Sequence, residues 1–254
     1  MAEPDRHLTV FTDGEPFAPD SRFRLSGTMR IGLFPSLFLL QCWNLSDSDS
    51  FLLRNTKELS VMREDSCLAY GQVSDVFTET VPEGTVTTAA FSLGLNLWER
   101  RVSLSVPSGV SVSETVRRIL AAAGTGIQLL SFPGEDPAFS RGQAFCSRTA
   151  DCITSVLSAA SARAYLVSAG LCVIPAEHLP ATLHLKDKDL TDRPSFADGG
   201  RKMILSTTVT GFQPGEEMTL ETEGKTCSGL ILERMVEADT AMGPWKTQLL
   251  VEVY

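Results

Sequence analysis

The 254-residue chain has no cluster of positive charge, only 7% aromatic residues and three histidines. Its 22 Lys and Arg residues are outnumbered by 31 Asp and Glu residues, so the net charge is −9. The densest basic stretch is the pair Arg100-Arg101. Because a phosphate backbone repels a surface of this sign, we expect no specific binding to nucleic acid.

The common catalytic motifs are also missing. The sequence contains no Gly-x-Ser-x-Gly, no phosphate-binding loop, no His-Glu-x-x-His and no Asp-x-Asp-x-Asp-Gly. No Cys-x-x-Cys pair occurs, although structural zinc sites commonly place two ligands on one turn in this way. We therefore predict no catalytic residues, no cofactor and no bound metal. We also predict buried, unpaired thiols, as in a reducing compartment, at Cys42, Cys67, Cys146, Cys152, Cys172 and Cys227.

No segment is long and apolar enough to span a membrane. The most apolar stretch, Ile31 to Trp43, is shorter than the ~20 residues that a spanning helix needs, and Pro35 interrupts it. The sequence starts with Met1-Ala2-Glu3-Pro4-Asp5, without the basic and apolar regions of a signal peptide. We expect synthesis in the cytoplasm and no membrane insertion.

Alternation of apolar and polar residues dominates from about Ser26 to Val106. Tyr70 to Thr80 and Thr85 to Trp98 are rich in Val, Thr and Phe, and the turn signal Pro82-Glu83-Gly84 separates them. Arg101 to Val106 then alternates strictly. This pattern predicts an antiparallel sheet or barrel.

A different pattern follows in the middle of the chain. Ser111 and Glu114 have capping-box spacing, apolar residues recur at helical intervals, and Gly124 suits a left-handed helix end. A second helix is predicted from Thr149 to Ala162, followed by a β-hairpin over Ala164 to Ile174. We predict a small α+β unit here.

After Pro175 the sequence alternates again. The expected strands cover Leu183 to Lys188, Met203 to Thr210, Met218 to Thr222, Gly229 to Val236 and Trp245 to Tyr254. In the last of these, Thr247, Leu249, Val251 and Val253 share one face. The predicted fold is mainly β with an inserted α+β domain, divided into an N-terminal arm (1–27), a first β domain (28–107), the insert (108–178) and a second β domain (179–254).

Two features leave other functions open. The carboxylate pairs Glu216-Glu217 and Asp75 with Glu79 are compatible with a hydrolase, which needs two carboxylates that converge across a cleft. Trp43, Trp98 and Trp245 each lie in or beside an expected strand, and exposed aromatics on a sheet are typical of a glycan- or peptide-binding β module.

Four passages carry a resemblance to a known family. The first is Trp43-Asn44-Leu45 with the strands Leu59 to Arg63 and Cys67 to Val73. The second is Gly109 to Leu120, and the third is Ala150 to Ala162 with the hairpin Ala164 to Ile174. The fourth runs from Val209 to Gly215, through Gly229 to Leu232, to the Gly-Pro-Trp-x-Thr stretch within Gly243 to Leu249. In this order, over residues 30 to 254, they resemble the baseplate-hub (tail-hub) proteins of tailed phages and related tail-like particles.

The resemblance implies a structural role without catalysis. It implies two small tail-tube-like β-barrels with the α+β domain inserted, and a homotrimeric ring that adapts a six-fold tail tube to a three-fold spike. The implied partners are further copies of the chain, the tail tube protein, a spike or needle protein, other baseplate proteins and the tape measure protein. The implied location is the tail baseplate of a virion, after synthesis in the host cytoplasm.

Overall fold

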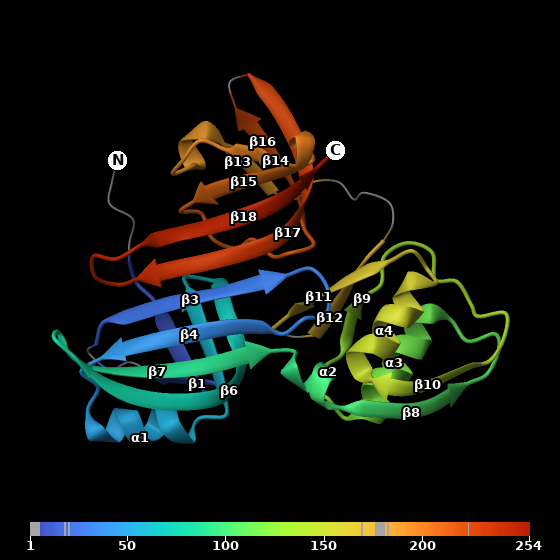
Figure 1. Ribbon diagram of the computed structural model, residues 1–254, viewed down its shortest axis with the longest axis horizontal. Coiled ribbons are helices and arrows are strands. Elements are labelled where there is room, and N and C mark those ends of the chain that lie inside the picture. The colour runs from blue at the N-terminus through green and yellow to red at the C-terminus, as the bar shows by residue number, and fades with distance from the viewer. Residues whose placement is uncertain are drawn as a thin grey trace. The chain divides into compact units, whose positions relative to one another are not determined.

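The computed structural model describes residues 6–17, 19, 21–168, 170–175, 181, 183–222 and 224–254. The chain divides into two compact units (Figure 1). The first comprises Met1–Met29, Ser36–Leu93 and Ala181–Tyr254, and the second comprises Arg30–Pro35 and Gly94–Pro180. Each unit is described separately below.

The first unit begins with seven strands and one helix, which we call the first half-sheet. They are β1 (Thr9–Thr12), β2 (Glu15–Phe17), β3 (Phe23–Arg30), β4 (Ser36–Trp43), α1 (Asp47–Asn55), β5 (Glu58–Arg63), β6 (Ser66–Val81) and β7 (Gly84–Leu93). The strands pair in the order β3-β4-β7-β6-β5-β1-β2. Alternate residues of β4 are buried, because successive side chains of a strand point to opposite faces.

The same unit continues with the second half-sheet. It contains β13 (Leu183–Lys186), η1 (Asp187–Asp189), β14 (Ser195–Ala197), η2 (Asp198–Gly200), β15 (Lys202–Thr207), β16 (Glu217–Thr222), β17 (Lys225–Asp239) and β18 (Trp245–Val253). The order is β14-β15-β18-β17, with β16 beside the first part of β17 and β13 parallel to β16. Its core consists of Leu185, Met203, Leu205, Phe212, Met218, Leu220, Ile231, Leu249 and Val251.

Pairing of β17 with β3 joins the half-sheets into one sheet of 13 strands. At the end of this seam the guanidinium of Arg22 makes two hydrogen bonds to the carboxylate of Asp239, Nε to Oδ1 at 3.0 Å and Nη2 to Oδ2 at 2.5 Å. The backbone N–H of Thr240 also donates to the carbonyl of Phe23 at 2.9 Å. The seam therefore combines ladder pairing with a bidentate ion pair.

The second unit is α+β. It contains α2 (Leu95–Glu99), β8 (Arg101–Val106), α3 (Val112–Ala123), β9 (Leu129–Ser131), β10 (Gln143–Arg148), α4 (Thr149–Ser158), β11 (Arg163–Val167) and β12 (Gly170–Ile174). Strands β8 and β10 form one antiparallel pair, and β11-β12-β9 form a second sheet. Apolar stripes of α3 and α4 are buried, as the helical spacing predicts.

Much of the predicted secondary structure is confirmed, including the mainly β composition. Helix α3 begins after Ser111, whose side chain accepts a hydrogen bond from the N–H of Glu114, and it ends at Gly124 with φ of 59°. The hairpin β11–β12 and the closing strand β18 also form where the sequence predicts them, and Thr247, Leu249 and Val251 are buried.

Three expectations are corrected. The strand expected over Thr85 to Trp98 ends at Leu93, because Gly94 has φ of +84° and turns the chain into α2. Residues 101–106, placed in the first β domain by their alternation, pair with β10 in the second unit. Residues 1–27, expected as an arm, contain β1 and β2 and most of β3, and β1 pairs with β5. The four-part division of the chain otherwise stays a prediction.

Candidate functional site

The carboxylate pairs noted in the sequence do not converge. Asp75 and Glu79 lie four residues apart on the extended strand β6, which separates them by ~13 Å, beyond the ~5–9.5 Å of a glycosidase pair. Glu216 precedes β16, where it accepts a hydrogen bond from the N–H of Gln213 at 2.8 Å, and burial raises its pKa. Glu217 instead accepts a hydrogen bond from the hydroxyl of Tyr254. The hydrolase hypothesis has no support in this arrangement.

The three tryptophans do not form a binding platform within either unit. Each carries an arginine over its ring: Arg22 lies 4.3 Å from the ring centre of Trp43, and Arg63 lies 5.3 Å from that of Trp245. In the second unit Arg148 lies 5.6 Å from the ring centre of Trp98. Trp245 is also only 9% exposed, and Phe34 stacks on Trp98 with ring centres 5.3 Å apart, so neither of these two rings is free to stack on a sugar or a peptide.

The remaining chemistry is sparse. Among the described residues no group of three or more His, Cys, Asp or Glu side chains could hold a metal ion. No helix in the described part is long and apolar enough to cross a membrane. All six cysteines are free thiols. Cys42 is buried, which raises its pKa to about 12, whereas Cys146 is exposed, contrary to the prediction of buried thiols.

The two half-sheets share one strand plan. In the first, hairpin β6–β7 pairs Val73 with Phe91 and then Asp75 with Ala90, so one residue of β6 is left unpaired in a β-bulge. In the second, hairpin β17–β18 pairs Ile231 with Val251 and then Glu233 with Leu250, so one residue of β17 is left unpaired in a β-bulge. Before the bulge, β5 lies along β6 and β16 lies along β17, both antiparallel. The registers therefore define equivalent positions in the two half-sheets.

A glycine precedes the bulge at the same position in both. A Cβ on Gly71 would overlap the backbone of Ser92, and a Cβ on Gly229 would overlap the backbone of Glu252. Ser92 and Glu252 are themselves equivalent, since each follows the residue paired just before the bulge. The same close backbone approach is thus built twice in one chain.

The half-sheets differ at one edge. Beyond its bulge, β17 pairs with β18 on one side, and it also pairs with β3 of the first half-sheet. Beyond its own bulge, residues 75–81 of β6 pair with β7. The pairing of β5 with β6 reaches only to Gln72, and no described strand lies on the other side of residues 75–81. Phe77 in this segment is 45% exposed. Arg54 of α1 donates a hydrogen bond to the hydroxyl of Thr78 at 3.1 Å, but no described strand pairs with this outer part of β6. Its edge is therefore of the kind that pairs with another chain.

A buried arginine marks the internal seam. Arg234 in β17 is 2% exposed, and its Nη1 donates to the carbonyl of Phe212 at 2.9 Å. Its Nη2 donates to the carbonyl of Leu68 in β6 and lies 2.9 Å from the sulfur of Met29. Burial lowers the pKa of Arg234 to about 10, so the side chain is still charged at neutral pH. One residue thus links the second half-sheet to two strands of the first.

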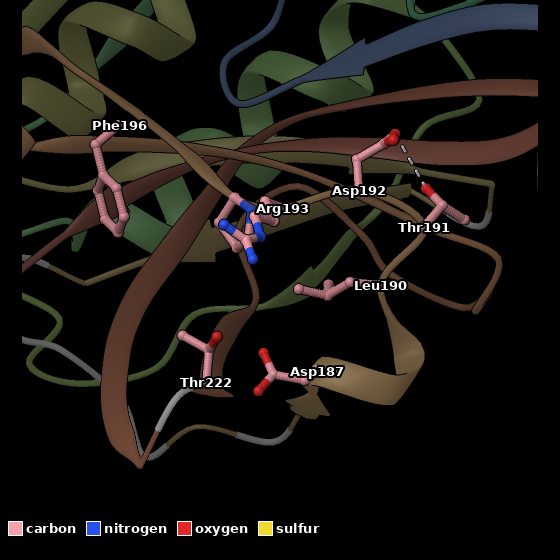
Figure 2. Close-up of a pocket in the computed structure, with 8 residues that line it drawn as sticks. Asp187, Leu190, Thr191, Asp192, Arg193, Phe196 and Thr222 are labelled. Atoms are coloured by element: carbon pink, nitrogen blue, oxygen red, sulfur yellow. Dashed lines mark hydrogen bonds between the residues drawn. The ribbon is translucent and has the colours of Figure 1, made fainter.

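A surface hollow of about 500 Å³ opens at the other end of the second half-sheet (Figure 2). Phe196 of β14, Leu190 and Arg193 of the connecting loop, and Thr222 at the β16–β17 turn line it. Asp192 accepts a hydrogen bond from Thr191 at 3.4 Å, and in Figure 2 its carboxylate points away from Arg193. Phe196 is 55% exposed, so the hollow offers both an apolar ring and a guanidinium to solvent.

Several solved structures share this fold. A tail protein from Neisseria meningitidis superposes with a TM-score of 0.72 at 11% identity, covering 96% of this chain and 95% of that one. A 43 kDa tail protein of prophage MuSo2 from Shewanella oneidensis gives 0.66 at 11% identity, covering 97% of each chain. No protein-family model and no curated sequence matches the chain.

A third structure with this fold comes from a secretion system. The E. coli protein c3393 is a component of the type VI secretion system, described as structurally similar to the bacteriophage T4 tail proteins gp27 and gp5. It superposes with a TM-score of 0.69 at 10% identity, covering 96% of this chain and 76% of that one. The chain therefore shares the mainly β, tail-tube-like fold of these tail proteins, which confirms the mainly β fold that the sequence resemblance implied. Closure of each half-sheet into a separate barrel stays a prediction.

Proposed function

We propose that the chain is a non-enzymatic hub protein of a phage-type tail baseplate, and that three copies close a ring. The observation that carries the proposal is the duplicated strand plan of the two half-sheets. Three chains with two equivalent half-sheets each present six similar positions around one axis. Such a ring matches a six-fold tube on one side and a three-fold spike on the other.

The seam between half-sheets supports ring closure. Within the chain, the outer part of β17 pairs with β3. The equivalent outer part of β6 lacks a described strand partner on that side, while the three-residue strand β14 is the edge strand that occupies the place of β3 in the second half-sheet. Pairing of β6 in one copy with β14 of the next repeats the internal seam between chains. Head-to-tail repetition of this seam closes after three copies.

The partners follow from the ring. Its six-fold face is suited to the tail tube protein, and its three-fold face to a spike or needle protein, with other baseplate proteins around it and the tape measure protein inside. The solved tail proteins and the type VI secretion component support this setting through their fold. The location is then the virion tail. A glycan- or peptide-binding role has no comparable observation in its favour, because each tryptophan ring already has an arginine over one face.

Mass measurement and imaging test the proposal. Native mass spectrometry across a concentration series should show a species of three times the 27.5 kDa chain mass. Imaging of assembled particles without imposed symmetry should place three copies on the tail axis below the tube. A chain that stays monomeric at every concentration and in the particle, or a ring of six copies, would rule the proposal out.

A further inference from the structure

We infer that α1 is a second contact between copies, beside the β6–β14 pairing, and that it docks in the hollow beside β14 of a second copy of this chain. The inference rests on the proposed ring, and it specifies which surfaces meet. It starts from the internal seam, where both partners belong to one chain and their contacts are known.

At the internal seam, the connection between β15 and β16 contacts the β5–β6 turn. The carbonyl of Thr208 accepts a hydrogen bond from Nη1 of Arg63 at 2.8 Å. Gly211 comes close to Ser66, since a Cβ built on it would lie 3.3 Å from the Ser66 hydroxyl oxygen. The carbonyl of Phe212 accepts from Arg234. The β15–β16 connection of the second half-sheet therefore fits the β5–β6 turn of the first.

The shared register extends this contact to the next copy. The connection after β4 is equivalent to the one after β15, because β4 pairs with β7 as β15 pairs with β18. Helix α1 occupies that connection in the first half-sheet. The β16–β17 turn is equivalent to the β5–β6 turn, and Thr222 of that turn lines the hollow. A repeated seam thus places α1 of one copy at the hollow of the next.

The chemistry of the two surfaces is complementary. Helix α1 buries Leu53 against its own sheet but leaves Phe51 70% exposed and Leu52 47% exposed. Asp47 lies one turn before Phe51, so both project from the same side of the helix. The hollow presents the exposed ring of Phe196 and the guanidinium of Arg193, together with the carboxylates of Asp187 and Asp192. Phe51 therefore meets the ring of Phe196, and Asp47 pairs with Arg193, whose neighbour Asp192 is turned away toward Thr191.

Photocrosslinking locates the contact. With p-benzoylphenylalanine in place of Phe51, irradiation of the assembled protein should give an intermolecular product joined to the peptide that contains residues 187–196 or to Thr222. The matched control carries the same group at Met242, which is 93% exposed in the β17–β18 turn. It should give no product with those residues.

Exchange of the two charges tests the pairing of Asp47 with Arg193, and it does so with three variants, so that the test does not fail if one variant does not fold. Asp47→Arg and Arg193→Asp should each weaken association of copies about tenfold, and the double variant should recover most of the loss. If the wild type forms trimers but Phe51 crosslinks elsewhere and the charge exchange shows no recovery, this inference is wrong and the proposed function stands. If the wild type never associates, the proposed function fails together with it.

Discussion

Arg234 in β17 donates a hydrogen bond to the backbone carbonyl of Leu68 in β6, across the seam of the two half-sheets. The two residues are 166 positions apart in the sequence. A second bond from the same guanidinium holds the carbonyl of Phe212. A planar, fully charged fork suits two carbonyls at once, which a lysine cannot satisfy in the same geometry.

Replacement of this arginine should destabilise the first unit. Arg234→Met leaves two buried carbonyls without their donor, which costs about 2–4 kcal/mol of unfolding free energy, and Arg234→Lys should recover only part of it. The control is Arg118→Met, since Arg118 is exposed and its pair with Glu114 on α3 is worth at most ~0.5 kcal/mol. Chemical denaturation measures all three, and equal stability of Arg234→Met and the control would contradict the role of Arg234.

The equivalent glycines should respond alike to the same change. Gly71→Ala and Gly229→Ala each force a methyl group into the neighbouring strand's backbone, with an expected loss of about 3 kcal/mol in each case. Thr226→Ala on the exposed face of β17 is the control and should stay within about 0.5 kcal/mol of the wild type. Losses that differ widely between the two glycines would argue against the equivalence of the half-sheets.

The Arg22–Asp239 pair should give the seam a defined pH dependence. Burial alone would raise the pKa of Asp239, but hydrogen bonds from Arg22 and from the N–H of Ala241 outweigh it and hold that pKa below its usual value. A lowered pKa means that the folded state favours the carboxylate, so its contribution is present above pH ~4 and disappears as the pH falls below that value.

Thermal melts of the wild type and Asp239→Asn measure this contribution. The wild type should melt at a higher temperature at pH 7, and the difference should shrink as the pH is lowered through the acid range. Asp198→Asn is the control, because Asp198 is exposed and pairs with Lys202 at 3.6 Å on the surface. A difference between wild type and Asp239→Asn that stays constant down to the lowest pH would show that ionisation of Asp239 is not involved.

The closing strand offers a matched pair of neighbours. Leu249→Asp puts a charge into the core of the second half-sheet, and we expect loss of several kcal/mol and insoluble protein. Gln248→Asp places the same charge on the other face of β18 and should be tolerated. Leu249→Ala, expected to cost about 2–5 kcal/mol, keeps the test quantitative if the charged variant does not fold. Soluble yield and melting temperature report the result.

The sequence predicted what local patterns encode. Helix α3 was predictable because Ser111, Glu114 and Gly124 mark its ends and an apolar stripe marks its buried face. Helix α1 was missed because Leu53 is its only buried residue, so it carries no stripe, although Ser46 does cap it through the N–H of Asp49. The N-cap residue Ser46 was the one sequence signal that could have predicted this helix.

Long-range pairing was out of reach. Arg101 to Val106 alternates as a strand, but alternation does not specify a partner, and β8 pairs with β10 some 40 residues later. The duplicated plan was equally hidden, because it lies in the backbone register rather than in matching residues. At the equivalent bulges the sequence shares Gly71 and Gly229 but little beside them.

One difference between the equivalent strands has a mechanical consequence. Register places Val76 of β6, opposite Ala89, where β17 has Arg234 opposite Leu249. In the proposed ring, the three seams inside chains each have a charged cross-link, and the three seams between chains have a valine instead. The seams between chains should therefore separate before the seams inside chains. Outward force on a spike, or a mild denaturant, should release three intact chains whose two half-sheets are still joined.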